Sequence, residues 1–136
     1  MNTKKRNDQL ISLAFRAMNE VDIFTEGNSI NSSYNRQIAA FCVSIAMSGL
    51  KPTIAFYSNT SSSASVDRSK IISIIGWMVS NDPAFVVEQG ENFIELEEIK
   101  STIFNASDER LPALRKEILD CSIALKQVVR TYNLID

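Results

Sequence analysis

The segment from residue 34 to residue 56 constrains the fold more than any other part of the chain. Its apolar residues recur at spacings of three and four, which places them on one face of an amphipathic helix: Tyr34, Ile38, Phe41, Cys42 and Ile45. Gly49 then ends this helix, because Gly adopts a left-handed backbone conformation without steric cost. Pro52 suits the first turn of another helix, which again carries apolar residues as far as Phe56. The segment therefore predicts a helix, a turn and a short second helix folded back on the first.

Helical spacing also recurs over the rest of the chain, in which Pro and Gly are scarce. It predicts four further helices, at about Thr3–Phe24, Val66–Ser80, Leu96–Phe104 and from Asp108 or Pro112 to about Tyr132. Asn31 or Ser32 is expected to cap the helix that contains Tyr34, and Ser65 to cap the helix that begins at Val66. The predicted fold class is all-α: a compact, single-domain bundle of about five to seven helices over residues 1–136.

Two segments between these helices are less regular. The serine-rich residues 58–65 favour turns and solvated backbone, so we expect a mobile loop there. Residues 84–94 leave two structures open, because Phe85-Val86-Val87 suits a short strand or part of a helix and Gly90 interrupts the segment.

Two of the predicted helices could contact another subunit. The helix over residues 66–80 is apolar on nearly every side, so it is either the centre of the bundle or partly buried by a partner, with Ile72 and Trp77 as interface candidates. The last helix carries an unbroken apolar seam from Leu111 to Tyr132. That seam packs within its own bundle or against a partner helix, and the internal packing is favoured because most amphipathic helices bury their apolar stripe on their own core.

Composition excludes most catalytic schemes. The chain has no His, the commonest general base and transition-metal ligand. Its two cysteines, Cys42 and Cys121, lie on predicted apolar faces and are expected to be core thiols. Glu95 and Glu98 would share a helix face and could ligate a divalent cation, but an exposed acidic first turn needs no metal. We therefore expect no enzyme, no metal and no cofactor.

Hydropathy and the first residues indicate the compartment. No apolar run reaches the length needed to cross a bilayer, and the N-terminal residues lack the pattern of a secretory leader. We expect a cytoplasmic protein without membrane contact.

Charge is divided unevenly along the chain. Residues 30–81 contain four basic residues and one acidic residue, whereas residues 82–120 contain ten acidic and four basic residues. Three interpretations stay open: solvated helix faces, contact of the positive half with phosphates, and head-to-tail association of opposite faces. The pI of about 5.2 lies below the range of a stand-alone nucleic-acid binder, so any RNA contact is expected within a larger assembly.

One family shows the same order of features. An apolar helix that begins near Tyr34, the Gly49-Leu50 turn, Ala55-Phe56, a variable loop and an apolar helix around Trp77 resemble the small, all-helical subunit of type III-B CRISPR–Cas effector (Cmr) complexes. The resemblance implies a non-catalytic structural role in RNA-guided antiviral defence. In that family, small subunits stack into a filament beside the backbone subunits that hold the guide RNA, and their basic face contacts the target RNA backbone. Target cleavage belongs to the backbone subunits.

The resemblance also implies the partners: other Cmr subunits, copies of the chain itself, guide RNA and target RNA, with no small-molecule substrate. The family supplies no catalytic motif to transfer, so the RNA-facing candidates are chosen by charge: Arg36, Lys51, Arg68 and Lys70, followed by Lys4, Lys5 and Arg6. The alternative is a helical adaptor or oligomerisation module unrelated to nucleic acid. A small metal-dependent hydrolase built on Glu95 and Glu98 ranks last.

Overall fold

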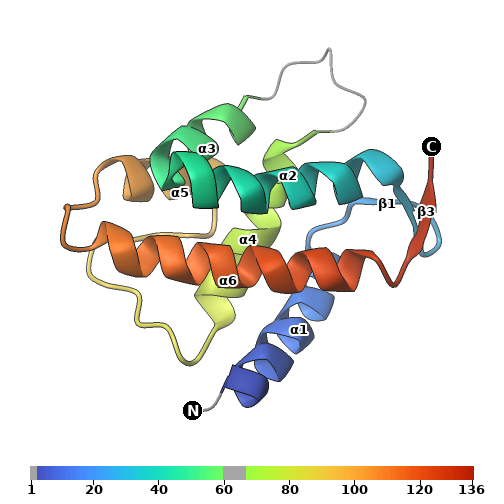
Figure 1. Ribbon diagram of the computed structural model, residues 1–136, viewed down its shortest axis with the longest axis horizontal. Helices are drawn as coiled ribbons and strands as arrows, with labels where there is room; N and C mark the ends of the chain where they lie inside the picture. Colours follow the sequence, from blue (N-terminus) through green and yellow to red (C-terminus); the bar gives the residue numbers. More distant parts are fainter. Residues whose placement is uncertain (1–2, 60–66) are drawn as a thin grey trace.

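The computed structural model describes residues 3–59 and 67–136, which contain six helices and three short strands (Figure 1). The elements in chain order are α1 (Thr3–Glu20), β1 (Phe24–Glu26), β2 (Ser29–Asn31), α2 (Ser32–Ser48), α3 (Leu50–Tyr57), α4 (Ser69–Asn81), α5 (Leu96–Phe104), α6 (Leu111–Val129) and β3 (Asn133–Ile135). The prediction of a compact, all-α fold is confirmed, with a three-stranded sheet as its one addition in this part of the chain.

The predicted helix, turn and second helix are present as α2 and α3. The side chain of Asn31 caps α2 by accepting a hydrogen bond from the Ser33 amide at 2.8 Å, as expected. All five apolar residues of the predicted face of α2 are buried. Gly49 separates the helices at a φ of 96°, a conformation that side chains other than Gly rarely adopt. The Thr53 hydroxyl then donates to the Gly49 carbonyl at 2.8 Å and fixes the start of α3.

A single hydrophobic cluster joins the helices. α1 packs against α4 and α6, α2 packs beside α6, and α5 contacts α3 and α4. The apolar seam of α6 lies within this core, with Leu114, Ile118 and Leu125 buried, which confirms that the seam packs internally. Cys42 and Cys121 are free, buried thiols, as predicted. Within the described residues, no helix is both long enough and apolar enough to cross a membrane.

The small sheet and its turns stand where the sequence predicted the ends of two helices. β1 pairs antiparallel with β2, and β3 pairs parallel with β2. Helix α1 therefore ends at Glu20 and not at Phe24, and α6 ends at Val129 and not at Tyr132. Phe24 and Tyr132 continue the apolar spacing because their rings pack against each other, with centroids 5.2 Å apart, although neither residue is helical.

The sequence also made predictions for the segments on either side of α4. The proposed cap Ser65, the start at Val66 and most of the predicted mobile loop lie outside the described residues. Helix α4 begins at Ser69, whose amide and hydroxyl both donate to the Asp67 carboxylate, at 3.0 and 2.6 Å. Residues 84–94, left open between strand and helix, form neither and make an irregular loop between α4 and α5.

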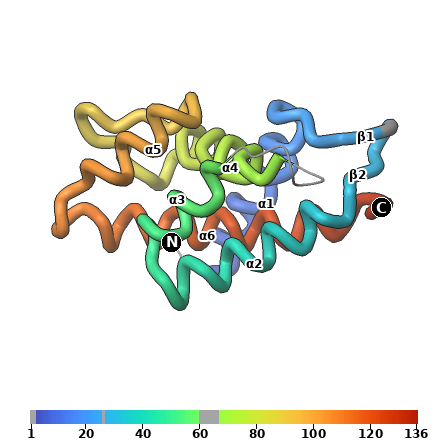
Figure 2. The backbone as a smooth tube through the Cα atoms, turned by 90° about the horizontal axis from the view of Figure 1, so that it is seen from above, coloured from blue at the N-terminus to red at the C-terminus, as the bar shows by residue number. Residues whose placement is uncertain are grey.

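The two ends of the molecule differ in structure. In both views, α5 and the loop before it lie at one end and the sheet lies at the other, while α2 and α6 span the length between them (Figures 1 and 2). The ends of the two long helices are thus held by different structures.

Candidate nucleic-acid interface

α2 and α6 lie side by side along one face of the molecule (Figures 1 and 2). They run in opposite directions, because β2 precedes α2, β3 follows α6 and the two strands pair. A buried hydrogen bond from the Cys42 thiol to the Ser122 hydroxyl, 3.3 Å long, joins them. We call the exposed surface of these two helices the α2–α6 face. It includes Arg36, Val43 and Met47 of α2, since the opposite side of that helix is buried in the core.

Basic residues line this face from end to end. On α6, Arg115 and Arg130 are exposed and Lys126 is half-buried. The eleven positions from Arg115 to Lys126 make about three helical turns, so both lie on one side of α6, about 16 Å apart along its axis. Ser122, one turn before Lys126, touches α2, which places this line of cations next to α2. Arg36 stands on α2 itself, where its guanidinium donates to the Ser33 hydroxyl at 2.9 Å.

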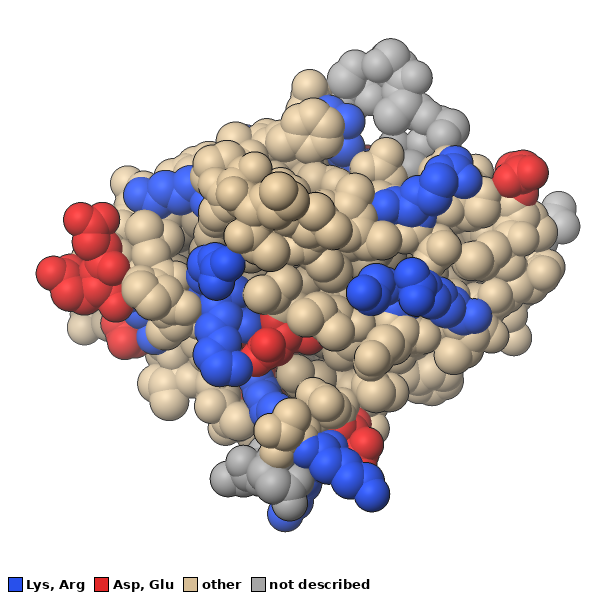
Figure 3. All heavy atoms as spheres, viewed as in Figure 1, with Lys and Arg blue, Asp and Glu red and all other residues tan. Residues whose placement is uncertain are grey.

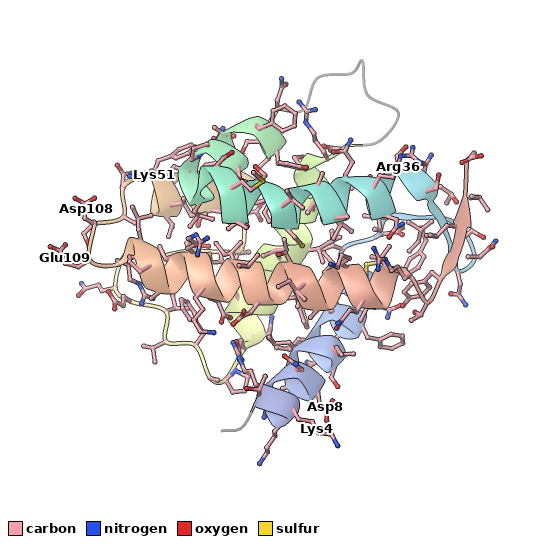
Figure 4. All side chains as sticks on the ribbon, viewed as in Figure 1. Lys4, Asp8, Arg36, Lys51, Asp108 and Glu109 are labelled. Carbon is pink, nitrogen blue, oxygen red and sulfur yellow. The ribbon has the colours of Figure 1, made fainter. Side chains whose placement is uncertain are left out.

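Lys51 joins the same surface at its far end. An open groove of about 450 Å³ between the starts of α3 and α6 is lined by Lys51 and Arg115 together with Pro52, Pro112 and Asp108. Figure 4 places Lys51 and Asp108 at this end of the molecule and Arg36 at the other end of α2. Two of the residues predicted from charge, Arg36 and Lys51, are therefore brought onto one face.

Acidic residues are scarce on this face. No Asp or Glu occurs in residues 27–66, which include all of α2 and α3. Figure 3 shows basic side chains spread over the α2–α6 face and acidic side chains gathered at the end where Figure 4 places Asp108 and Glu109, with a few others in view, some of them beside basic side chains near the middle. Within the described part of the chain, none of the cations on the two helices of this face is in an ion pair, except Lys116, which pairs with Asp120. Surfaces of this kind suit phosphate groups, because Lys and Arg replace the counterions that are condensed on a nucleic acid.

Arg68 and Lys70 lie elsewhere. The Tyr34 hydroxyl donates to the Asp67 carbonyl at 3.4 Å, so residues 67–70 border the buried side of α2, opposite Arg36. The Arg68 guanidinium stacks 4.2 Å from the centre of the Phe56 ring, and Lys70 donates to the Asp22 carbonyl at 3.2 Å. The structure therefore divides the four main candidates into two separate pairs.

Arg6 takes part in two ion pairs within the chain, and its role as an RNA-facing residue stays a prediction. Its guanidinium donates to Asp82 at 2.9 Å and to Glu117 at 2.7 Å, and each of these carboxylates is only 4 % exposed. The three residues tie α1 to the end of α4 and to α6. Its neighbours Lys4 and Lys5 are exposed on the first turns of α1 (Figure 4 labels Lys4), away from the α2–α6 face.

Of the two buried carboxyls in this cluster, one is protonated at neutral pH. Burial raises the pKa of Glu117 to about 8, and the hydrogen bond and negative charge of Asp82 add to the effect against the attraction of Arg6. Burial also acts to raise the pKa of Asp82, but hydrogen bonds from Glu117, the Ala84 amide and Arg6 lower it below its usual value. At neutral pH we therefore assign a protonated Glu117 beside an ionised Asp82. The Cys121 thiol completes the cluster, and burial raises its pKa.

The two predicted interface residues have different surroundings. Ile72 is 2 % exposed and packs in the core, so it offers no surface to a partner and that prediction is wrong. Trp77 is half-buried, and the Arg16 guanidinium of α1 covers its ring at 5.3 Å from the centroid. The apolar character of α4 is thus explained by its position at the centre of the bundle.

Sequence reasoning missed the cations of α6. Arg115 lies within residues 82–120, which carry a large excess of acidic residues, and Lys126 and Arg130 lie beyond the two ranges whose charges were compared. In the structure, six of those ten acids are in ion pairs: Asp82 and Glu117 with Arg6, Glu88 and Glu91 with Arg110, Glu97 with Lys100, and Asp120 with Lys116. The spacing of the basic residues along the predicted last helix, at sums of three and four, would have predicted that they share one side of it.

The acidic residues considered as a metal site stay on the surface. Glu95, Glu97 and Glu98 are exposed at the start of α5, where Lys100 pairs with Glu97 at 3.2 Å. Among residues 3–59 and 67–136, no group of three or more Cys, Asp or Glu side chains is placed to hold a metal ion.

Comparison with known proteins identifies the family. The family described as CRISPR-associated protein (Cas_Cmr5) matches residues 10–132, which is nearly the whole chain. No curated protein and no solved structure gives a match. The match includes α2, α3, α4, α5 and α6 in full, so it extends over the α2–α6 face as well as the turn at Gly49. The chain belongs to the Cas_Cmr5 family and is the small subunit of a type III-B Cmr complex, which implies association with other subunits of that complex.

Proposed function

We propose that this small subunit binds the backbone of the target RNA through the α2–α6 face and takes no part in the chemistry of cleavage. Copies of the chain stack beside the backbone subunits of the Cmr complex, in the cytoplasm, as part of antiviral defence. One observation carries the RNA contact: a line of cations on α6 lies beside an α2 helix that contains no acidic residue. The absence of His from the sequence supports the non-catalytic role.

The contact with RNA is through phosphates and is independent of base sequence. Arg36, Arg115 and Arg130 present guanidinium groups, which bind phosphate oxygens in a bidentate manner. Ser and Asn side chains on α2 add neutral hydrogen-bonding groups. Because the isoelectric point of the whole chain is low, binding is weak for one copy and gains strength when several copies are aligned in a complex.

The test uses the assembled Cmr complex and the double substitution Arg36→Ala with Arg130→Ala. Removing two phosphate contacts weakens target-RNA retention at low salt by on the order of tenfold. The slope of log affinity against log salt concentration falls by about 1.4, that is, about 0.7 for each single-strand phosphate contact. The rate of cleavage per bound target stays unchanged, because no group of this chain acts on the scissile bond.

The matched control is a pair of substitutions that removes two cations elsewhere on the surface. Lys4→Ala with Lys70→Ala leaves both retention and the salt slope as in the unsubstituted complex. Equal losses in the two pairs, or unchanged retention for the Arg36 and Arg130 pair at low salt, would show that the α2–α6 face is not the RNA site. A fall in cleavage rate at saturating target would count against the non-catalytic role.

A further inference from the structure

The loop between α4 and α5 is irregular but held in place by Arg110. The Arg110 guanidinium donates to Glu91 at 2.8 Å and to the Val86 carbonyl at 2.7 Å, and it lies 3.3 Å from the Glu88 carboxylate. The same guanidinium covers the Phe85 ring at 4.9 Å from its centroid. One side chain from the start of α6 therefore fixes four residues of this loop.

A second set of contacts fixes the other half of the loop. The Thr102 hydroxyl of α5 bonds both the amide and the carbonyl of Asn92, at 2.9 and 3.1 Å. Phe93 is 2 % exposed, and its carbonyl lies so close to Gly76 that any side chain at position 76 would overlap it. Both halves of the loop are thus attached to the bundle, the first half through Arg110 and the second through Thr102 and Phe93.

This fixed loop presents apolar side chains to solvent. Val86 is 75 % exposed, Ile94 is 70 % exposed and Val87 is 41 % exposed. All three are β-branched and have few rotamers, so little conformational freedom is left to lose when a partner covers them. A preorganised apolar surface of this kind is typical of a site that binds another protein.

The charge around these residues defines the partner. Glu88, Glu95, Glu97 and Glu98 are exposed and lie within four residues of them along the chain. Arg110 pairs with Glu88 and Lys100 pairs with Glu97, so Glu95 and Glu98 are the two that have no ion pair within the described residues. A phosphate backbone is repelled by such a rim, and a Lys- or Arg-bearing surface is attracted. The sign is opposite to that of the α2–α6 face, so the two surfaces select different partners.

We propose that Val86, Val87 and Ile94, with their rim of four glutamates, form the surface by which this chain docks onto a basic, apolar-centred surface of another Cmr subunit. We call this the loop surface. The inference rests on membership of the Cmr complex and not on the proposed RNA contact. It assigns the two functions to separate places, with RNA on the α2–α6 face and the protein partner at the end of the molecule near α5.

The apolar part of the proposal is tested by Val86→Ser with Ile94→Ser in a Cmr complex assembled from its purified subunits. We expect incorporation of this chain to weaken by about tenfold or more, because exposed apolar anchors that become buried carry much of the binding energy. The matched control is Ile11→Ser with Phe15→Ser, two exposed apolar residues of α1. It should change incorporation by less than about twofold, and both pairs should leave the unfolding midpoint of the free chain nearly unchanged.

The rim is tested separately by converting Glu95, Glu97 and Glu98 to Gln. This variant should incorporate less well at low salt and lose most of the salt dependence seen with the unsubstituted chain.

Several outcomes would overturn the proposal. One is normal incorporation of the Val86 and Ile94 pair, and another is an equal loss of incorporation with the control pair. Self-association of the purified chain through Val86 and Ile94, seen by sedimentation, would make the occupant a second copy. A cross-linker at position 94 that captures RNA would exclude a protein partner.

The RNA variants keep this test distinct from that of the proposed function. Arg36→Ala with Arg130→Ala should incorporate normally while losing target RNA. Complexes forced to incorporate the Val86 and Ile94 variant at high concentration should retain target RNA normally.

Discussion

Glu117 is a buried carboxyl that keeps its proton at neutral pH because Asp82 already supplies the negative charge that Arg6 binds. The pKa of Glu117 is raised to about 8 in the folded chain, from 4.5 when unperturbed. Between these two values the folded chain holds a proton that the unfolded chain has lost, so the free energy of unfolding contributed by Glu117 falls as the pH rises. Asp82 has a lowered pKa and acts in the opposite direction, at lower pH.

We expect the unsubstituted chain to be less stable at about pH 8.5 than at about pH 5.5, and Glu117→Gln to remove most of this difference. Glutamine keeps the shape and the neutral charge of the protonated acid. Urea unfolding, followed by the fluorescence of Trp77, measures the change. Glu98→Gln, on the exposed start of α5, serves as the control and should keep the pH dependence of the unsubstituted chain. If the Glu117→Gln variant kept that same dependence, Glu117 would have to be ionised in the fold.

At the scale of elements, a very close contact lies at Gly76 of α4. A Cβ at this position would overlap the Phe93 carbonyl oxygen and lie 2.6 Å from Ile99 Cδ1 of α5. In a free helix, Gly→Ala stabilises by about 1 kcal/mol. Here we expect Gly76→Ala to destabilise the chain by about 1–3 kcal/mol, because overpacking outweighs helix propensity.

Denaturant unfolding gives the sign of this effect directly. Ser80→Ala, an exposed position on the same helix, should change the stability by less than about 0.5 kcal/mol. A stabilised Gly76→Ala variant would mean that α5 and the loop before it can move away from α4 at no cost.

The helices could be predicted from the sequence because their apolar spacing and end signals agree. Asn31 and Gly49 mark the two ends of α2 in the sequence and in the structure. The sheet could not be predicted, since each strand has three residues, which is too short for an alternating pattern to be distinguished. Phe24 and Tyr132 were assigned to helices because packing against each other requires the same apolar residue types as packing on a helix face.

The candidate site was predicted only in part, for a related reason. Arg36 and Lys51 were found because their surroundings in the sequence lack acids. The ion pairs of Arg6 could not be predicted, because its partners Asp82 and Glu117 are 76 and 111 positions away, which only the fold reveals. The cations of α6 were missed since charges summed along the chain do not separate buried acids from exposed bases.

At the scale of the whole molecule, one hydrophobic cluster includes buried residues from all the described helices. The single-domain organisation stays a prediction, and the cluster makes it testable. We expect one cooperative unfolding transition, with the fluorescence of Trp77 and the far-UV circular dichroism of the helices changing at the same denaturant concentration. Trp77 reports on the contact between α1 and α4, because Arg16 covers its ring. Two separate midpoints would show that α1 leaves the bundle before the other helices melt.

The parallel pairing of β2 with β3 also determines the order of events during folding. Ser29 pairs with Asn133, so the contact closes a ring of more than one hundred residues. Closing so large a ring costs much chain entropy, and this cost is met only after α2 and α6 have packed together. On a ribosome that adds about 5–20 residues per second, β2 waits roughly 5–20 seconds for its partner strand. We therefore expect the pairing of β3 with β2 to form last, after the local β1–β2 hairpin, and incomplete synthesis to leave that edge of β2 open.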